Sequence, residues 1–506
     1  MRRRLFVVSD LHLGGSRDSV SAIGEAILGS ALFTSGPAFS EFVRWITAEY
    51  NKNHDELTEL VINGDIFDFL CELGPIPAGA AADWFANEQL AMDIAETIGR
   101  EFGAADGPLA ALRDFVARGG ELTLLIGNHD VELSYPRVRA WLKTQLESPG
   151  RKVNFIYDGE AYAVADVLIE HGNRYDPWNV IDHDAMRRDR AVMSRQRLSG
   201  RLEEPQFHPP AGSHMVVFVL NALKRQYRFV DLLKPETELV LPLLVTVCPP
   251  VIGVIRALAS TAPTIHAELG STRGLESGSP EHLGYLSASD SGDKPAAEAL
   301  AQLLGSEAHL FSAELAELSG STVHGLSASE WTKEAARQAR EMFAQIQRGW
   351  AFITLLAPGS RQQTLSRLQA ALRVFNRSDP FSLEQESDLY LDPARRLVAA
   401  GYNVVIFGHT HLPKHVRLGA TAEYVNTGTW ADVLRIPSAA LADDSGGRQA
   451  LEEFAQDLAD NNYTKYAFRR LTYAEVEIPE TGPSRVALLE YKGKDDPRGV
   501  LAETAQ

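Results

Sequence analysis

The chain has 506 residues, and this length predicts about two to four domains, or one domain with large insertions. Its composition, 45% hydrophobic and 23% charged residues, is that of a globular protein. The net charge of −18 argues against a general nucleic-acid-binding protein, because phosphate backbones select surfaces rich in Lys and Arg. A small anionic substrate stays compatible with this charge, since a bound metal ion can supply local positive charge.

The two cysteines, Cys71 and Cys248, are too few for a disulfide framework, which favours a reducing compartment. The N-terminal sequence MRRRLFVVSDLHLGG begins like a signal peptide, but its apolar run ends after Val8 and is too short for one. We therefore expect a cytoplasmic protein.

The stretch at 239–255, LVLPLLVTVCPPVIGVI, carries no charged residue and is therefore a candidate for contact with a membrane. Its length is marginal for a span, and Pro242, Pro249 and Pro250 would interrupt a helix. The stretch is therefore interpreted as a buried core segment, with peripheral contact at the inner face of the membrane as the alternative.

The first part of the chain alternates short apolar runs with helical patterns. The runs 5–9, 59–63, 122–127 and 167–172 predict buried strands, and 39–52 and 84–118 have the spacing of amphipathic helices. Alternating strands and helices predict α/β layering, in which ligands gather at the carboxyl ends of strands.

The pattern then changes to helical stretches and returns to strands at 403–408. The segments HVRLG and AEYVNTGTW follow as strands, then a helix near 448–461, and LTYAEVEI and RVALLEY predict a hairpin around Glu480–Pro483. We therefore predict a core in two parts, 1–179 and 396–506, the second ending in this hairpin, separated by a mainly helical cap insertion at 180–395.

Five loops at predicted strand ends carry potential metal ligands. They are SDLHLG with Asp10 and His12, NGDIFD with Asp65 and Asp68, GNHD with Asn128, His129 and Asp130, EHGN with His171, and GHTH with His409 and His411. Taken alone, each of these motifs is more often a helix cap, a turn or a site of a structural histidine than a metal-binding site. Together, carboxylate, imidazole and amide oxygens suit two divalent ions, with manganese favoured and iron or zinc as alternatives.

In this order, the motifs DxH, GDxxD, GNHD, a downstream His and GHTH resemble those of the calcineurin-like metallophosphoesterase superfamily. The resemblance covers 1–178 and 396–436 and implies a β-sandwich flanked by helices, with two metal ions at strand ends. It implies a first ion bound by Asp10, His12, Asp65 and His411, and a second bound by Asp65 as bridge, Asn128, His171 and His409.

The same resemblance assigns His129 to the substrate phosphate and the leaving group. Asp130 is expected to orient His129 by a hydrogen bond. Asp68 is expected to contact the metal ligands without binding an ion itself. The implied reaction is the hydrolysis of a phosphomonoester, phosphodiester or pyrophosphate by metal-bound hydroxide, with His129 assisting departure of the leaving oxygen.

Within the superfamily, DLHL, GDIFD and GHTH followed by a residue and proline are similar to the UDP-2,3-diacylglucosamine hydrolase branch, which implies a lipid-linked or nucleotide-sugar substrate. The chain departs from that branch at His129, where an arginine is typical, and in the extended sequence HGNRYDPWN at 171–179. Arg174 and Tyr175 could reach a second phosphate or a sugar, and the alternative for Arg174 is a salt bridge to a neighbouring Asp.

Two other functions stay open at this stage. A nucleotide or nucleic-acid phosphodiesterase would use the same ions, although the acidic balance disfavours nucleic acid. A non-catalytic interaction protein on the same fold should have lost ligands, and none is missing. The expected partner is a small phosphorylated substrate, with an amphipathic lipid as an alternative and no nucleic acid.

Overall fold

The structure is a computed structural model of the chain. It describes residues 2–15, 19–20, 26–27, 31–52, 56–72, 85–176, 179–196, 205–210, 212–213, 216–224, 228–234, 365, 368–369, 372, 380–442 and 444–501. Contacts divide the chain into two compact units, Met1–Leu243 with Asn376–Gln506, and Leu244–Phe375. The elements described below belong to the first unit. The stretch 239–255 and most of the expected cap at 180–395 lie outside the described residues.

The larger sheet is mixed and is built around four parallel strands. These strands are β1 (Arg2–Val8), β4 (Glu56–Asn63), β5 (Glu121–Leu125) and β6 (Asn154–Ile156). On the other edge of β1, antiparallel strands β14 (Thr472–Ile478), β15 (Arg485–Glu490) and β16 (Gly499–Val500) complete the order β16-β15-β14-β1-β4-β5-β6.

The second sheet is also mixed and has the order β10-β11-β9-β8-β7. Its strands are β7 (Tyr162–Val164), β8 (Val167–Ile169), β9 (Val404–Phe407), β10 (Pro413–Arg417) and β11 (Glu423–Thr427). Strands β8, β9 and β11 are parallel, whereas β7 and β10 are antiparallel edge strands. Pairing of β8 with β9 joins the first part of the core to the part that follows the expected cap.

Two small two-stranded sheets complete the described strands. One pairs β12 (Asp432–Leu434) with β13 (Ala467–Arg469), and the other pairs β2 (Ser19–Val20) with β3 (Ala26–Ile27). These pairs were not predicted, because strands of two or three residues leave no periodic pattern in the sequence.

The predicted strands and the C-terminal hairpin are confirmed. The runs 5–9, 59–63, 122–127, 167–172 and 403–408 correspond to β1, β4, β5, β8 and β9, whose central residues are buried. The hairpin forms by antiparallel pairing of β14 with β15. Short apolar runs bounded by turn residues are typical of strands buried on both faces, which explains why periodicity located them.

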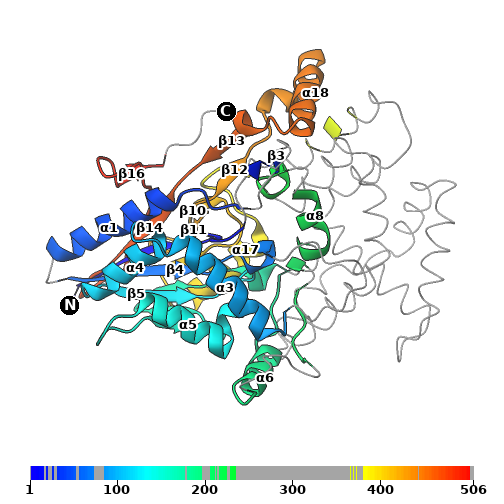
Figure 1. Cartoon of the computed structure of the whole chain (residues 1–506). Helices are drawn as coiled ribbons and strands as arrows, with labels where there is room; N and C mark the ends of the chain where they lie inside the picture. Colours follow the sequence, from blue (N-terminus) through cyan, green and yellow to red (C-terminus); the bar gives the residue numbers. More distant parts are fainter. Residues whose placement is uncertain are drawn as a thin grey trace, which may run out of the picture. The chain divides into compact units, whose positions relative to one another are not determined.

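Helices α1 (Gly36–Lys52), α3 (Glu88–Phe102), α4 (Pro108–Ala117) and α5 (Pro136–Leu146) lie over one face of the larger sheet (Figure 1). The predicted helical region 84–118 is therefore two helices, which separate at Gly103 and restart at Pro108. Proline is favoured at the first helical position because it has no N–H to leave unpaired there. The short helices α2 (Phe69–Glu72) and α8 (Asn221–Lys224) and helix α6 (His183–Met193) also belong to this unit.

Helix α17 (Asp388–Ala399) covers the outer face of the second sheet, where Tyr390, Leu391 and Ala394 pack against β9 and β11. The predicted boundary between cap and core, 395/396, therefore falls inside a helix that packs on the core. The predicted helix at 448–461 is α18 (Ser445–Ala459), which begins after Asp444, whose side chain accepts a hydrogen bond from the Gly447 N–H.

The main hydrophobic core lies between the two sheets. Leu5 and Val7 of β1 belong to the same buried cluster as Ile169 of β8 and Ile406 of β9. Side chains alternate between the two faces of a strand, so Phe6 points the other way and contacts Trp45 of α1, with ring centroids 5.4 Å apart. The molecule is thus a mixed α/β protein in which helices cover the outer faces of two mixed sheets.

A cluster of aromatic rings holds α1 against the C-terminal strands. Phe42 lies with its ring centroid 5.0 Å from that of Trp430 and 4.9 Å from that of Tyr473. The Trp430 ring is completely buried, and its indole N–H donates to the Thr472 carbonyl oxygen at 2.9 Å. Trp430 therefore connects the loop after β11 to strand β14.

In the part of the chain that the structure describes, none of the helices has the length and apolar character needed to cross a membrane.

We predict that Trp430→Ala lowers the free energy of unfolding by about 3–5 kcal/mol, because it leaves a large cavity and removes a buried hydrogen bond. Urea unfolding followed by circular dichroism measures the change. Val500 is 77% exposed, so Val500→Ala should shift the same quantity by less than about 0.5 kcal/mol. Equal losses in the two variants would contradict the packing described here.

Candidate metal centre

The polar loops identified in the sequence meet at one place because they follow parallel strands. Three of them follow β1, β4 and β5 of the larger sheet, and two follow β8 and β9 of the second sheet. Carboxyl ends of parallel strands share one edge, so loops far apart in sequence become neighbours. Backbone bonds join them: the His12 N–H donates to the Asp65 carbonyl oxygen at 2.9 Å, and the His409 N–H donates to Asp10 Oδ2 at 3.0 Å.

Most of the predicted ligands that flank these strands have a backbone conformation that L-residues rarely adopt. Among the described non-glycine residues with positive φ, five of the seven are predicted metal ligands: Asp10 (53°), His12 (51°), Asp65 (49°), His409 (71°) and His411 (61°). A left-handed conformation costs a non-glycine residue about 1–3 kcal/mol and persists only where surrounding structure enforces it. Such a concentration of strain is typical of a functional site.

Two motif glycines allow these loops to approach closely. A methyl group on Gly127, in GNHD, would collide with the Asp65 carboxylate. One on Gly408, in GHTH, would meet Asp10 Oδ2 and Ser9 Oγ. Both glycines are required because a carboxylate from another strand end occupies the space of a side chain.

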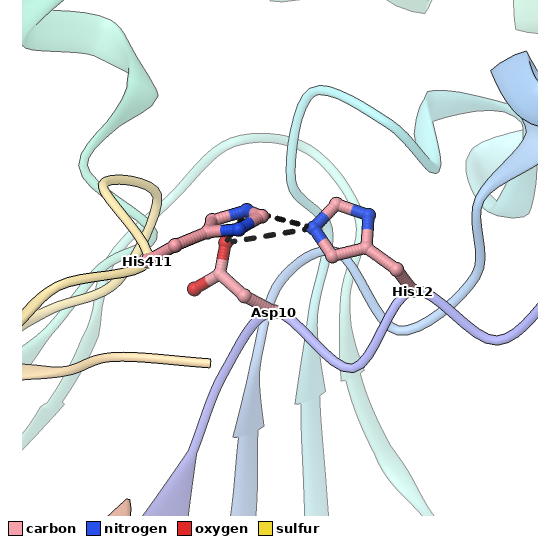
Figure 2. Close-up of side chains that lie close together, drawn as sticks. All are labelled: Asp10, His12 and His411. Atoms are coloured by element: carbon pink, nitrogen blue, oxygen red, sulfur yellow. Dashed lines mark hydrogen bonds and ion pairs between the residues drawn. The ribbon is translucent and has the colours of Figure 1, made fainter. Parts of the chain in front are cut away.

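Asp10, His12 and His411 form the first buried ligand group (Figure 2). His12 Nε2 lies 2.9 Å from His411 Nε2, and Asp10 Oδ1 lies 3.4 Å from His411 Nε2. Figure 2 shows the three side chains pointing toward one another from the loops after β1 and β9. The Asp65 carboxylate adjoins this group, with Oδ2 3.8 Å from His12 Nε2.

Asp65, His171 and Asp10 form a second buried group. His171 Nδ1 lies 2.8 Å from the Asn63 carbonyl oxygen, which fixes that nitrogen as the donor and turns Nε2 toward Asp65 Oδ2 at 3.2 Å. Asp10 belongs to both groups, and Asp65 Oδ2 lies near one imidazole of each, 3.8 Å from His12 Nε2 and 3.2 Å from His171 Nε2.

Two buried oxygens of predicted ligands, Asp10 Oδ1 and Asn128 Oδ1, have no hydrogen-bond partner among the described residues. Buried polar atoms are rarely left unpaired, because desolvation without a partner costs free energy. A metal ion fits these atoms, since carboxylate, imidazole and amide oxygen are ligands for divalent ions of hard to borderline character. The residues present could thus hold a metal ion.

The charges of the two groups are coupled through Asp65. Burial raises the pKa of Asp65, but the neighbouring His171 and His129 outweigh it and hold that pKa well below its usual range. Burial lowers the pKa of His171, whereas Asp65 raises it more strongly, to about 10. Burial and the nearby Lys234 ammonium lower the pKa of His411, so this ring is neutral. In the metal-free protein the Asp65 carboxylate is thus compensated by the His171 imidazolium.

The structure corrects one predicted contact. Asp130 does not orient His129: its carboxylate accepts hydrogen bonds from the backbone N–H groups of Gly127 at 2.6 Å and Ile66 at 2.7 Å. The carboxylate that contacts His129 is Asp68, whose Oδ1 lies 3.2 Å from His129 Nδ1. Asp130 therefore joins the loops after β4 and β5, while Asp68 takes the role expected of Asp130.

Arg174 and Tyr175 have partners that favour a structural role. The Tyr175 hydroxyl donates to Glu170 Oε1 at 2.5 Å, and its ring stacks on Phe407 with centroids 5.2 Å apart. Arg174 donates to the Gly159 carbonyl oxygen at 2.7 Å and lies 3.5 Å from Glu170. For Arg174 this is the salt-bridge alternative, with a glutamate in place of the expected aspartate.

The loop after His171 contributes two residues that sequence reasoning missed. Asp176 Oδ2 lies 3.0 Å from His409 Nε2, and Asn179 Nδ2 donates to the same oxygen at 2.7 Å. Asn179 Oδ1 in turn accepts from Asn128 Nδ2 at 3.3 Å, which leaves Asn128 Oδ1 as the atom available to an ion. The sequence signal for these residues was the extended sequence HGNRYDPWN, in which Asp176 contacts His409 and Asn179 contacts Asn128.

No family model matches the chain, and no curated protein matches its sequence. The functional assignment therefore depends on the residues of this site.

We expect metal binding to release a proton and to strengthen as the pH rises. His171 holds a proton up to its pKa of about 10 in the metal-free protein, whereas a coordinating imidazole is neutral. The apparent affinity should increase by up to about tenfold per pH unit for one proton, and level off above that pKa. Calorimetric titration of manganese in buffers of different ionisation enthalpy counts the protons. The His171→Asn variant should release fewer protons on binding manganese. An affinity that did not change with pH would contradict the assignment of His171 as a metal ligand.

We also expect Asp176→Ala and Asn179→Ala to weaken the binding of one of two ions. Each variant frees a ligand of the predicted second ion, and loss of such a supporting hydrogen bond lowers metal affinity about 10–100-fold. Metal analysis and the electron paramagnetic resonance of the manganese-loaded protein distinguish one bound ion from a coupled pair. Asp184→Ala removes a carboxylate that is 75% exposed and is the matched control. If both variants still bound two ions tightly, Asp176 and Asn179 would not support the ligands of the second ion.

Proposed function

We propose that this chain is a metal-dependent phosphoesterase of the calcineurin-like superfamily that binds two divalent ions, with manganese favoured and iron or zinc as alternatives. The observation that carries the proposal is the convergence of the seven predicted ligands from loops at parallel strand ends, five of them on residues with a strained, positive φ. Asp10 Oδ1 and Asn128 Oδ1 are also buried without a hydrogen-bond partner among the described residues. These are the residues of the motifs DxH, GDxxD, GNHD and GHTH. The arrangement of two mixed sheets with helices outside them is compatible with the sandwich of that superfamily.

In this proposal Asp65 would contribute a ligand to both ion sites. Asp10, His12 and His411 complete the first site, which agrees with the first buried group and its 2.9 Å contact between imidazole nitrogens. The remaining ligands, Asn128, His171 and His409, belong to the second site. Bound ions would supply positive charge to the phosphoryl oxygens and make a water molecule acidic enough to attack phosphorus.

His129 is the residue that the chain itself offers to the departing oxygen. Its side chain is 19% exposed, whereas the His12 side chain is fully buried, so His129 is the more accessible of the two. Burial lowers the pKa of His129, but Asp68 and Asp65 outweigh it and raise the pKa to about 9 in the metal-free protein. Asp68 holds Nδ1, which leaves Nε2 to donate a proton to the leaving group.

The proposed substrate is a small phosphorylated compound: a phosphomonoester, a phosphodiester or a pyrophosphate. A lipid-linked or nucleotide-sugar substrate is a proposal that depends on the resemblance to the UDP-2,3-diacylglucosamine hydrolase branch. Contact with a membrane surface is a proposal that depends on the uncharged stretch 239–255. The net charge of −18 supports a small substrate rather than nucleic acid.

We predict that the manganese-loaded protein hydrolyses p-nitrophenyl phosphate, bis-p-nitrophenyl phosphate or UDP-2,3-diacylglucosamine. His129→Ala should lower kcat by about 10²–10⁴-fold for an alkyl phosphate ester, whose alkoxide needs a proton to depart, and by less for the p-nitrophenyl esters, whose p-nitrophenolate leaves without one, while metal content stays unchanged.

His415→Ala is the matched control, because His415 pairs with Glu423 on the neighbouring strand and is not a ligand. If the folded, metal-loaded protein turned over none of these esters with any divalent ion tested, the proposed function would be wrong. Loss of metal in His129→Ala would instead show that His129 is a ligand.

A further inference from the structure

A third group of side chains beside the candidate metal centre also has the arrangement of metal ligands: His12, Asp68 and His129. His12 Nδ1 lies 3.7 Å from Asp68 Oδ2, and His129 Nδ1 lies 3.2 Å from Asp68 Oδ1. Two imidazole nitrogens therefore approach the two oxygens of one carboxylate. The group differs from the two predicted ion sites, because Asp68 and His129 are ligands of neither.

Two atoms of this group face each other without forming a hydrogen bond. His12 Nδ1 and Asp68 Oδ2 are buried, and neither has a hydrogen-bond partner among the described residues. Their separation of 3.7 Å is too long for a hydrogen bond. Zinc bonds of about 2.0–2.2 Å place two ligand atoms of a tetrahedral ion about 3.3–3.6 Å apart, which is close to this separation. An ion here would offset the cost of leaving both atoms unpaired.

Backbone hydrogen bonds hold the group in place without an ion. The Cys71 N–H donates to Asp68 Oδ1 at 3.0 Å, and the Phe69 N–H donates to the His129 carbonyl oxygen at 3.2 Å. The His129 N–H donates to Asp65 Oδ1 at 2.8 Å. Because these contacts fix the carboxylate and the loop that carries the ring, an ion pays little entropy to order its ligands.

The donor set of this group favours zinc over manganese. Two imidazoles and one carboxylate are three protein ligands of a common zinc set, with a fourth position open, whereas manganese prefers mainly oxygen ligands. The His129 side chain is 19% exposed, while those of Asp68 and His12 are almost completely buried. An ion would therefore enter from the side of His129.

The His12 ring cannot serve this group and the first predicted ion site at once. A neutral imidazole offers one nitrogen lone pair to a metal, because its other nitrogen carries the proton. His12 turns Nε2 toward His411 Nε2 at 2.9 Å, and its other ring nitrogen points away from His411 (Figure 2). An ion on His12 Nδ1 would thus remove a ligand from the first site.

We propose that His12, Asp68 and His129 form an inhibitory zinc site, which fills when zinc is present in excess over the ions of the proposed active site. Zinc bound there would take His12 from the first ion and hold His129, the proposed acid, away from the leaving group. The inhibitory effect rests on the proposed phosphoesterase function. The binding of zinc by these three residues does not depend on it.

The first test measures zinc inhibition of p-nitrophenyl phosphate hydrolysis by the manganese-loaded protein. Because p-nitrophenolate leaves without a proton, His129→Ala should keep enough activity for an inhibition constant to be measured. That constant should rise by at least about tenfold in His129→Ala, since even the loss of a hydrogen bond to a ligand costs this much metal affinity. Zinc that only replaced manganese in the two predicted sites would inhibit both proteins equally.

His415→Ala is the matched control for this measurement, because His415 pairs with Glu423 and belongs to none of the three groups. Its inhibition constant for zinc should equal that of the wild-type protein. An equal rise in His415→Ala and His129→Ala would overturn the site, since any lost histidine would then have the same effect.

A second test counts zinc without using activity. The His411→Ala variant weakens the first predicted site and keeps the inhibitory one, so calorimetric titration with zinc should lose affinity for one ion when His129→Ala is added. Asp68→Asn in the same background should weaken the same ion, and it replaces His129→Ala if that double variant does not fold.

Unchanged zinc affinities and unchanged inhibition constants would overturn the zinc site while leaving the phosphoesterase function intact. Zinc binding through His129 in a manganese-loaded protein that hydrolyses no ester would overturn the proposed function and the inhibitory effect, but would support the site.

Discussion

The Asp65 carboxylate is the constraint on which the rest of the site depends. It is almost completely buried, and an ionised group in such a place needs compensating partners. The His129 N–H donates to Asp65 Oδ1 at 2.8 Å, and His171 approaches Oδ2 from the other side. Gly127 is a glycine because this carboxylate occupies the space of a side chain. The loops after β4, β5 and β8 are therefore arranged around one buried charge.

This arrangement stores free energy that the core must offset. The five left-handed ligand residues together cost several kcal/mol on the scale of about 1–3 kcal/mol each, and the unpaired buried ligand atoms add to that cost. The apolar cluster between the two sheets, with Leu5, Val7, Ile169 and Ile406, lies directly beneath these loops in the same strands. A rigid core below the site keeps the loops in conformations that short peptides would leave. Sites of this kind exchange stability for function, and an ion bound at these residues would return part of that stability.

The topology divides the predicted ligands between the two sheets. The larger sheet supplies Asp10, His12 and Asp65, and the second sheet supplies His171, His409 and His411. Because the cluster forms only where both sheets meet, neither sheet by itself has a complete ligand set.

The sequence by itself determined the main strands of the two large sheets, the hairpin and the candidate ligands, because buried strands and polar turn residues leave local patterns of composition. It could not decide which carboxylate contacts His129: Asp130 is adjacent in sequence, yet packing turns it to the backbone of Gly127 and brings in Asp68 from 61 residues away. Tertiary structure alone also brought Asp176 to His409, and Val433 to Phe468. Periodicity records whether a residue is buried. Its partner depends on how separate strands are placed together, and no local pattern contains that information.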